Sequence, residues 1–393
     1  MQFTLPETFN PAEFGLRPSL VDPSRWLIST IVRKTADRKV DERGIVRLHS
    51  KVLQGVCHDR YSDVVKPLKT GGVIETFPYS AGEKSTGYRL TAEYVDQPLV
   101  RVPCTDPYLA ERIRRGYRQM DERKKKGKRL PIHERLEDCQ RELTVSDDAE
   151  TAIASFTKPA ARLGQRALVH RIRHGEFSSF VSPTGRWFNA ITNMKKELRR
   201  CLLLAGEPVG CVDICESQPA LLASMILQHY HPSLPSTSLT YKGTVGGRGG
   251  ESLPADLLDY CSLVSAGSFY EALGGMTGTS RPRAKKRFLV DVLAKKGNYP
   301  SKIEDAFRDR FPTVYEFIRR TNRKSHAELI RRLQRAEADF VIGSVAPRLV
   351  DSIPVVSLHD ALYGRLGDVD EIETAFHATC EEAGFKMAFK REV

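Results

Sequence analysis

Two short apolar runs, PVGCVDI at residues 208–214 and IPVVSLHD at residues 353–360, decide how the second half of the chain folds. Both runs are rich in β-branched residues and end in an aspartate, which predicts two buried strands. Neighbouring strands lie about 4.8 Å apart, so the carboxylates of Asp213 and Asp360 would converge at the ends of paired strands. A helix N-cap or a strand-end turn would also explain either aspartate taken alone.

Converging carboxylates at strand ends match the preference of Mg²⁺ for oxygen ligands. Transfer of a nucleotide to a 3′-hydroxyl uses two divalent ions about 3.5 to 4 Å apart, one at the attacking oxygen and one at the leaving group. Asp213 and Asp360 would be such a pair, able to bind two Mg²⁺ ions, for which Mn²⁺ can substitute.

The chain of 393 residues has 61 Lys and Arg against 49 Asp and Glu, which gives a formal net charge of +12. A positive field of this size concentrates polyanions, so nucleic acid is the expected partner. A basic protein without such a partner is the alternative reading of the charge. The length predicts two or three domains, each able to bury its own core.

The eight cysteines include no CxxC pair, and no histidine stands at zinc-ligand spacing from them. This pattern predicts reduced thiols. No segment approaches the roughly 20 apolar residues of a membrane span, and the N-terminal sequence lacks the basic start and apolar stretch of a signal peptide. We therefore expect a cytoplasmic protein that does not bind membranes.

Residues 28–95 contain a helical stretch, then GIVRLHSKVLQGVCHDRYSDVVKPLKTGG, then VIETF and GYRLTAE around the turn-rich YSAGEKST. This order of helices followed by a hairpin resembles a winged helix, in which one helix lies in the major groove and the hairpin contacts phosphates. A domain used only for packing or protein contacts is the alternative. Pro67 leaves the boundary of the last helix open. The predicted DNA contacts are Arg60, Lys66, Lys69, Lys84 and Arg89.

Two blocks around the first aspartate are SPTGRWFNAITNMKKELRRCLL at residues 182–203 and CVDICESQPALLA at residues 211–223. They resemble the stretch leading into motif A, and motif A itself, of family A DNA polymerases and the related single-subunit RNA polymerases. The second block places the family's metal-binding carboxylate on Asp213. Its Ser-Gln lies two residues further from the aspartate than in the family, and we expect Gln218 to contact the nucleotide. The resemblance implies that Arg186, Asn193 and Arg200 contact the primer-template.

The block SRPRAKKRFLVDVLAKKG at residues 280–297 resembles motif B, a fingers helix with an Arg-x3-Lys pattern. Residues four apart lie on one helix face, so Arg281 and Lys285 could both reach a triphosphate, with Lys285 neutralising the charge that develops on the leaving pyrophosphate. Lys286 is also predicted to bind the nucleotide. Lys286 and Arg283 are the alternative cations if the motif is shifted by one or two positions. The family's aromatic residue eight positions after the lysine is Leu293 here.

The last block comprises LQRAEAD at residues 333–339 and VVSLHDALYG at residues 355–364. Gln334 matches the glutamine of the family's IQGSAAD stretch, which implies a primer-template contact. The His-Asp pair is similar to motif C, in which His359 would orient the primer terminus while Asp360 binds metal. Ala361 stands where DNA enzymes usually carry Glu, a feature of the RNA-polymerase branch.

The resemblance covers residues 180–393 and implies a helix-rich α/β (α+β) fold. We expect a right-hand polymerase core of palm, fingers and thumb, and a winged helix ahead of it. The implied activity is template-directed DNA synthesis without proofreading, in replication of a plasmid or phage. The partners are primer-template DNA or single-stranded nucleic acid and nucleoside triphosphates. The alternatives are a primase or single-subunit RNA polymerase, and a winged-helix replication factor with an inactive core. The expected regions are an arm at 1–27, the winged helix at 28–95, a basic linker or thumb-like region at 96–160, and the core at 161–393.

Overall fold

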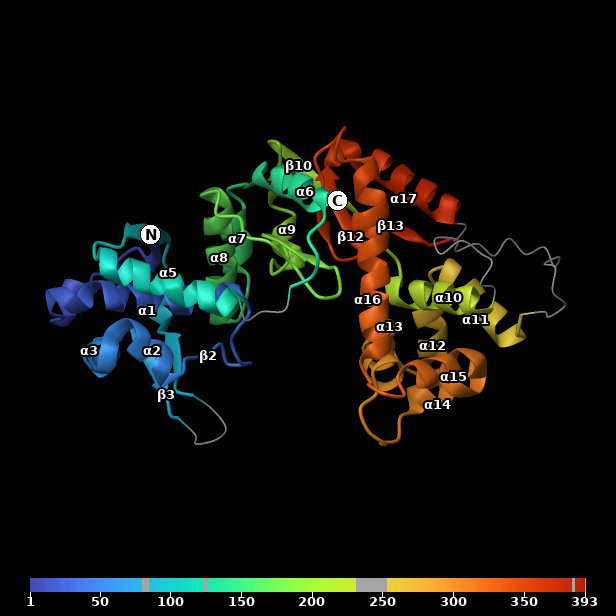
Figure 1. Cartoon of the computed structure of the whole chain (residues 1–393), viewed down its shortest axis with the longest axis horizontal. Helices are drawn as coiled ribbons and strands as arrows, with labels where there is room; N and C mark the ends of the chain where they lie inside the picture. Colours follow the sequence, from blue (N-terminus) through green and yellow to red (C-terminus); the bar gives the residue numbers. More distant parts are fainter. Residues whose placement is uncertain (80–84, 123–125, 231–252, 384–385, 393) are drawn as a thin grey trace. The chain divides into compact units, whose positions relative to one another are not determined.

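The computed structural model describes residues 1–79, 85–122, 126–230, 253–383 and 386–392 (Figure 1). The protein has an α+β fold that is mostly helical, with several small sheets. It divides into two compact units. The first comprises Met1–Lys125, Leu143–Ser178 and Asn189–Leu203, and the second comprises Lys126–Glu142, Ser179–Phe188 and Leu204–Val393.

The first unit combines helices with short antiparallel strands. In chain order its elements are β1 (Gln2–Pro6), η1 (Pro11–Phe14), α1 (Pro18–Ala36), β2 (Val46–Arg47), α2 (Ser50–Cys57), η2 (His58–Arg60), α3 (Tyr61–Thr70), β3 (Ile74–Phe77), β4 (Gly87–Leu90), α4 (Ala92–Val95), β5 (Leu99–Pro103), α5 (Pro107–Glu122), β6 (Leu143–Val145), α7 (Ala149–Ala154), α8 (Pro159–Arg173), α9 (Lys196–Arg199) and β9 (Leu202–Leu204). Its N-terminal residues form β1, which pairs antiparallel with β5.

The segment from α1 to β4 contains three helices followed by a hairpin, the order expected from the sequence, with one short strand between the first two helices. The three strands form a sheet in the order β2-β4-β3, with Val46 opposite Tyr88 and Ile74 opposite Leu90. Helix α3 continues through Pro67 to Thr70, so the proline does not end it. The buried side chains of α3 face the rest of the unit, and its lysines are exposed.

The second unit holds the two aspartates and most of the predicted site. Its elements are α6 (Pro131–Arg141), β7 (Phe180–Val181), β8 (Trp187–Phe188), β10 (Glu207–Ile214), α10 (Ser217–Tyr230), α11 (Ala255–Ser265), α12 (Phe269–Thr277), α13 (Arg281–Arg287), the π-helix η3 (Phe288–Leu293), α14 (Lys302–Arg310), α15 (Pro312–Thr321), α16 (Glu328–Phe340), the π-helix η4 (Val341–Val345), η5 (Ala346–Arg348), β11 (Val356–Leu358), β12 (Ala361–Arg365), η6 (Leu366–Asp368), α17 (Val369–Ala383) and β13 (Phe389–Glu392).

An antiparallel sheet forms one part of this unit. Strand β12 lies between β11 and β10, and β13 pairs with the other edge of β10. This register places Asp213 of β10 between Ala361 of β12 and Lys390 of β13. Helix α17 packs against β10 and β12, and α6 packs against β11. Asp213 therefore lies on a central strand, where its backbone is held from both sides.

A group of helices, α11 to α15, forms the other part of the unit, and α16 runs between this group and the sheet in Figure 1. The group is built around the buried rings of Tyr260, Phe269, Phe288, Phe307 and Phe311, whose centroids lie 5.0–6.2 Å apart. These rings meet edge to face or at a tilt, and their packing fixes the helices relative to one another. Across the described residues, none of the helices combines the length and apolar character needed to cross a bilayer.

Candidate active site

The structure brings the two predicted carboxylates together at one end of the sheet. Asp213 is the penultimate residue of β10, and Asp360 lies in the two-residue turn that joins β11 to β12. The amide of Ile214 donates a hydrogen bond to the backbone oxygen of Asp360, at 3.1 Å, which fixes this turn against the end of β10. The strand adjacent to β10 is thus β12, which follows the His-Asp turn, and β11 lies one strand further away.

The turn itself requires an unusual backbone conformation. His359 has a φ of 58°, in the left-handed region that non-glycine residues seldom adopt. Strained positions of this kind cluster at functional sites in proteins. Here the conformation closes the β11–β12 hairpin in two residues and so keeps Asp360 next to β10.

The two carboxylates interact electrostatically. Burial, followed by the negative charge of Asp360, raises the pKa of Asp213 to about 6, and the ammonium group of Lys390 opposes this effect. Two carboxylates that repel each other in a partly buried site are stabilised by a cation between them. The local electrostatics therefore favour a positively charged ligand.

Each aspartate has a close side-chain partner among the described residues. Lys390 Nζ lies 2.7 Å from Asp213 Oδ2 and 3.3 Å from Glu392 Oε1, because β13 pairs with β10 in this register. Ser217 Oγ, at the start of α10, donates a hydrogen bond to Asp360 Oδ2 at 2.7 Å. The sequence blocks gave no indication of the lysine, since the contact joins segments far apart in the chain.

The donor set fits Mg²⁺. Asp213, Asp360 and the Ser217 hydroxyl supply oxygen atoms only, and Mg²⁺ usually takes one or two carboxylates and completes its coordination with water and substrate phosphates. Within the described ranges, no group of three or more His, Cys, Asp or Glu residues is arranged to hold a metal ion by itself. The arrangement therefore suits an ion that is shared with a phosphate-bearing substrate.

A third carboxylate, Glu337 of α16, lies near this pair. Burial raises the pKa of Glu337 to about 7, the guanidinium of Arg186 opposes that shift, and the charges of Asp360 and Asp213 add to it. Arg186 donates from Nε and Nη2 to the two carboxylate oxygens, at 2.8 and 2.7 Å. Arg186, predicted to contact the primer-template, is thus held by a buried acid on α16.

The position of Glu337 was detectable from the sequence. Leu329, Leu333 and Glu337 follow one another at four-residue spacing, and all three are buried on one face of α16. An acid within an apolar helical stripe indicates a buried charge that needs a partner. The motif resemblance of LQRAEAD points only to Gln334, so this acid was missed.

The local structure explains the Thr-Gly-Arg sequence at residues 184–186. Ser182 to Gly185 form the turn of the β7–β8 hairpin, in which the amide of Gly185 donates to the Ser182 carbonyl at 2.9 Å. Pro183 suits the second position of such a turn, and Gly185 adopts a φ of 80° that favours glycine. The next residue is Arg186, so the turn sets the direction in which its side chain leaves the hairpin.

Glu216, also missed from the sequence, connects the turn after β10 to the helical group. Its buried carboxylate accepts the amide hydrogens of Phe269 and Tyr270, at 3.0 and 2.9 Å, and so caps the N-terminus of α12. Burial raises the pKa of Glu216, whereas these two N–H donors lower it. Its φ of 55° places it in the left-handed region. Arg281 Nη2 lies 3.8 Å from Glu216 Oε1.

The predicted triphosphate contacts lie on one face of α13. The Arg281 guanidinium and the Lys285 ammonium are 5.8 and 5.9 Å from the centroid of the Tyr270 ring, as expected for residues four apart on a helix. Lys286 is exposed on the same helix. The α-helix ends at Arg287 and continues as a π-helix, a form that is frequent at functional sites.

The other predicted core residues are distributed over both units. Gln218 is the second residue of α10, and its Oε1 atom is buried without a hydrogen-bond partner among the described residues. Gln334 is half-buried on α16, three residues before Glu337. Asn193 and Arg200 belong to the first unit, where the Asn193 carbonyl accepts hydrogen bonds from Arg38 and Gln165 and Arg200 is exposed.

The predicted DNA contacts of the first unit differ in their surroundings. Arg60, Lys66 and Lys69 are exposed on η2 and α3. Arg89 is held on the sheet, because it forms an ion pair with Glu75 and donates to a backbone carbonyl. Lys84 lies outside the described residues.

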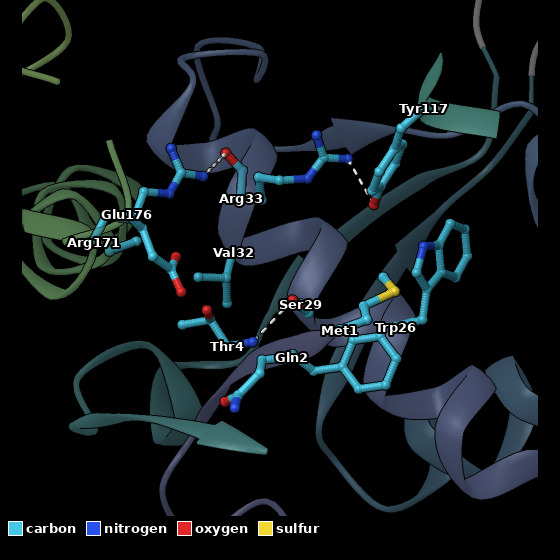
Figure 2. Close-up of a pocket in the computed structure, with 12 residues that line it drawn as sticks. Met1, Gln2, Thr4, Trp26, Ser29, Val32, Arg33, Tyr117, Arg171 and Glu176 are labelled. Atoms are coloured by element: carbon cyan, nitrogen blue, oxygen red, sulfur yellow. Dashed lines mark hydrogen bonds between the residues drawn. The ribbon is translucent and has the colours of Figure 1, made fainter. Parts of the chain in front are cut away.

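A small pocket of about 130 Å³ lies in the first unit (Figure 2). Its wall includes Trp26, Arg33 and Tyr117, and Arg33 Nη2 donates to the Tyr117 hydroxyl at 3.2 Å. The pocket is smaller than the roughly 300 Å³ or more that ligand sites typically have. None of the predicted site residues lines it.

Comparison of the chain with protein-family models found no match, and comparison with curated proteins found no similar sequence.

Proposed function

We propose that the second unit is a nucleic-acid polymerase of the family A type that lacks proofreading. One observation carries the proposal: Asp213 and Asp360 are brought together by adjacent strands, and their repulsion contributes to raising the pKa of Asp213 to about 6. Two carboxylates that lie close together and repel each other are suited to bind divalent cations that act in nucleotidyl transfer.

The residues around the carboxylates fit the roles of such an enzyme. Two Mg²⁺ ions, when bound by Asp213 and Asp360, would activate the 3′-hydroxyl and stabilise the leaving pyrophosphate. Arg281 and Lys285 bind the triphosphate from one face of α13, and Lys285 neutralises charge on the leaving group. Lys286 and Gln218 add nucleotide contacts.

The remaining core residues bind the growing strand and its template. His359 orients the primer terminus next to Asp360, and Gln334 contacts the duplex from α16. Arg186 pairs with Glu337, and this pair holds the β7–β8 hairpin beside the site. Asn193 and Arg200 supply primer-template contacts from the first unit.

The helices and hairpin from α1 to β4 act as a winged helix that binds DNA. The strand order β2-β4-β3 and the exposed lysines of α3 support this role. A compact polymerase joined to a DNA-binding module suits an initiator. We therefore propose that the protein replicates plasmid or phage DNA in the cytoplasm.

A primase or single-subunit RNA polymerase is the second candidate. Ala361 favours this candidate, because it follows the catalytic aspartate at the position where DNA enzymes usually carry Glu. Ala361 also pairs directly with Asp213 in the sheet. The two candidates differ in sugar preference and in the need for a primer.

The test is nucleotide incorporation by the full chain with Mg²⁺ or Mn²⁺. Primed and unprimed single strands are offered with dNTPs and with NTPs separately, and Asp213→Ala is the inactive control. Extension of a primed strand with dNTPs supports the DNA polymerase, and unprimed synthesis with NTPs supports the primase. Incorporation that persists in Asp213→Ala, or no incorporation by the wild type in any combination, contradicts the proposal and favours a DNA-binding factor with an inactive core.

A further inference from the structure

Three aromatic side chains form a continuous stack that leads from the surface to the motif C turn. The rings of Phe180 and Phe188 are parallel, with centroids 4.7 Å apart and 7° between their planes. The ring of Phe188 in turn meets that of His359 edge to face, at 5.6 Å and 73°. His359 precedes Asp360, so the stack ends beside the candidate catalytic carboxylates.

The outer ring of the stack is exposed. Phe180 is 47% exposed, whereas Val181 and Trp187, the neighbouring cross-strand pair of the hairpin, are 6% and 1% exposed. Successive residues of a strand point to opposite faces, so the apolar side of the hairpin is already buried through the other pair. The exposed position of Phe180 is therefore not explained by packing of the hairpin.

The hairpin that carries the stack is fixed on both sides. Arg186 is bound by Glu337, as described above, and the amide of Gly127 donates to the Val181 carbonyl at 2.8 Å. A side chain at position 127 would place its Cβ 1.9 Å from the Ser182 oxygen, so the two backbones are in close contact. The platform is thus held in place before any ligand binds.

Positive charge lies next to this hairpin. The segment that contains Gly127 also carries Lys128 and Arg129. Arg129 forms an ion pair with Glu137, so its charge is partly neutralised, whereas Lys128 is exposed. An aromatic platform with a neighbouring basic segment is the combination that binds single-stranded nucleic acid, in which bases stack on rings and cations contact phosphates.

We infer that Phe180 and Phe188 form a stacking platform for an unpaired nucleobase of a single nucleic-acid strand that passes beside His359 and Asp360. The inference rests on the proposed function, because it names the nucleic-acid strand that the proposed active site binds. The ring of Phe188 covers one face of Phe180, and the base stacks on the exposed part of the Phe180 ring. Every base has such a face, so binding is tolerant of sequence.

The test uses the metal-free full chain and a short oligodeoxythymidine that contains one 2-aminopurine, at fixed salt. The expected result for the wild type is binding with a change in 2-aminopurine emission, because the fluorescence of this base responds to stacking. Phe180→Leu keeps the apolar volume and removes the aromatic face, and we expect it to lose roughly fivefold or more in affinity. Phe180→Tyr keeps the ring and should bind within about twofold of the wild type.

One further variant separates stacking from charge. Phe180→Leu leaves the slope of log affinity against log salt unchanged, whereas Lys128→Gln weakens binding and makes the slope shallower. Tyr230→Leu is the matched control, since Tyr230 is 43% exposed and lies at the opposite end of α10 from Ser217, about 20 Å along the helix. This control should bind as the wild type does.

The outcomes distinguish the platform from the polymerase. Equal affinities of wild type and Phe180→Leu, or binding by the wild type without any change in emission, contradict the platform whatever the enzyme does. An Asp213→Ala protein should retain the emission change, because stacking needs no catalysis. If stacking is observed but the wild type incorporates no nucleotide, the polymerase proposal fails and the single-strand binding site remains.

Discussion

Arg186, which follows the turn of the β7–β8 hairpin, donates two parallel hydrogen bonds to Glu337 of α16, at 2.8 and 2.7 Å. The glutamate is almost fully buried, and the arginine side chain is 17% exposed. Two-point pairing of this kind sets both distance and direction between the hairpin and the helix. It therefore fixes the hairpin next to the strand ends that carry the candidate catalytic aspartates.

Removal of one partner of this pair should destabilise the protein strongly. Arg186→Met leaves the Glu337 carboxylate buried without its counter-ion, and we expect a loss of about 3 to 5 kcal/mol in the free energy of unfolding. Denaturant unfolding of the full chain at pH 8 measures the loss. The double variant Arg186→Met/Glu337→Met should recover much of it, because no charge remains buried. A double variant no more stable than the single one would show that the charge pair is not the cause.

Lys390 should compete with divalent cations for Asp213. Its ammonium lies 2.7 Å from the carboxylate, in a half-exposed ion pair of the kind that contributes about 0.2 to 1 kcal/mol. Lys390→Met is therefore expected to bind Mn²⁺ roughly twofold to fivefold more tightly at pH 8, as measured by calorimetric titration. Lys386→Met, an exposed lysine on the same C-terminal segment, is the control. Weaker binding by Lys390→Met would indicate that the lysine supports the metal site.

The two strands that precede or carry the aspartates, β11 and β10, were predictable because their apolar runs are local in sequence. The order of helices and hairpin from α1 to β4 was predictable for the same reason. The pairing partners were not, because hydrophobic pattern does not determine strand order. The position of β12 between β11 and β10, and the contact of Lys390 with Asp213, depend on pairing between distant segments.

Other parts of the site depend on buried side chains that the sequence motifs did not reveal. Glu337 stands in the apolar stripe of its helix, which indicates a buried acid but not its partner Arg186, and Glu216 has the appearance of an ordinary turn residue, although both carboxylates are buried beside the predicted site. The resemblance of residues 280–297 to motif B implies a helix there, but it does not indicate that the α-helix ends at Arg287. No residue pattern in this block indicates the change to a π-helix.

The shifted pKa of Asp213 predicts how stability depends on pH. Its folded-state pKa of about 6 lies above the usual value of 3.8, so the metal-free native state retains a proton that the unfolded chain has lost between about pH 4 and 6. The contribution of Asp213 to stability therefore declines as the pH rises through this range. Asp213→Asn, which mimics the protonated form, should be about 2 to 3 kcal/mol more stable than the wild type at pH 7.5 and close to it at pH 4.

Metal-free protein in a chelating buffer, unfolded with urea at both pH values, provides the measurement. Asp309→Asn is the control, because this aspartate is exposed on α14. An Asp213→Asn difference that does not change with pH would contradict the account of the carboxylate pair.

The lysines of α3 should contribute to DNA binding in the first unit. Lys66→Gln/Lys69→Gln is expected to weaken binding to duplex DNA and to reduce the slope of log affinity against log salt by about 1 for each phosphate that is no longer neutralised. Fluorescence anisotropy across a salt series measures both quantities. Lys158→Gln is the control, since this exposed lysine precedes α8 and lies outside the helices and hairpin of the winged-helix-like segment. Equal slopes for the double variant and the wild type would show that α3 does not contact DNA.

The most direct test of the central claim is nucleotide incorporation by Asp360→Asn, compared with the wild type and with Asp309→Asn, on a primed single strand with Mg²⁺. The substitution keeps the shape of the side chain and removes the charge that a metal ion requires. The account predicts extension by the wild type and by Asp309→Asn, and a loss of at least about 100-fold in rate for Asp360→Asn with strand binding retained. Incorporation by Asp360→Asn at the wild-type rate would contradict the assignment of the two aspartates as the catalytic centre.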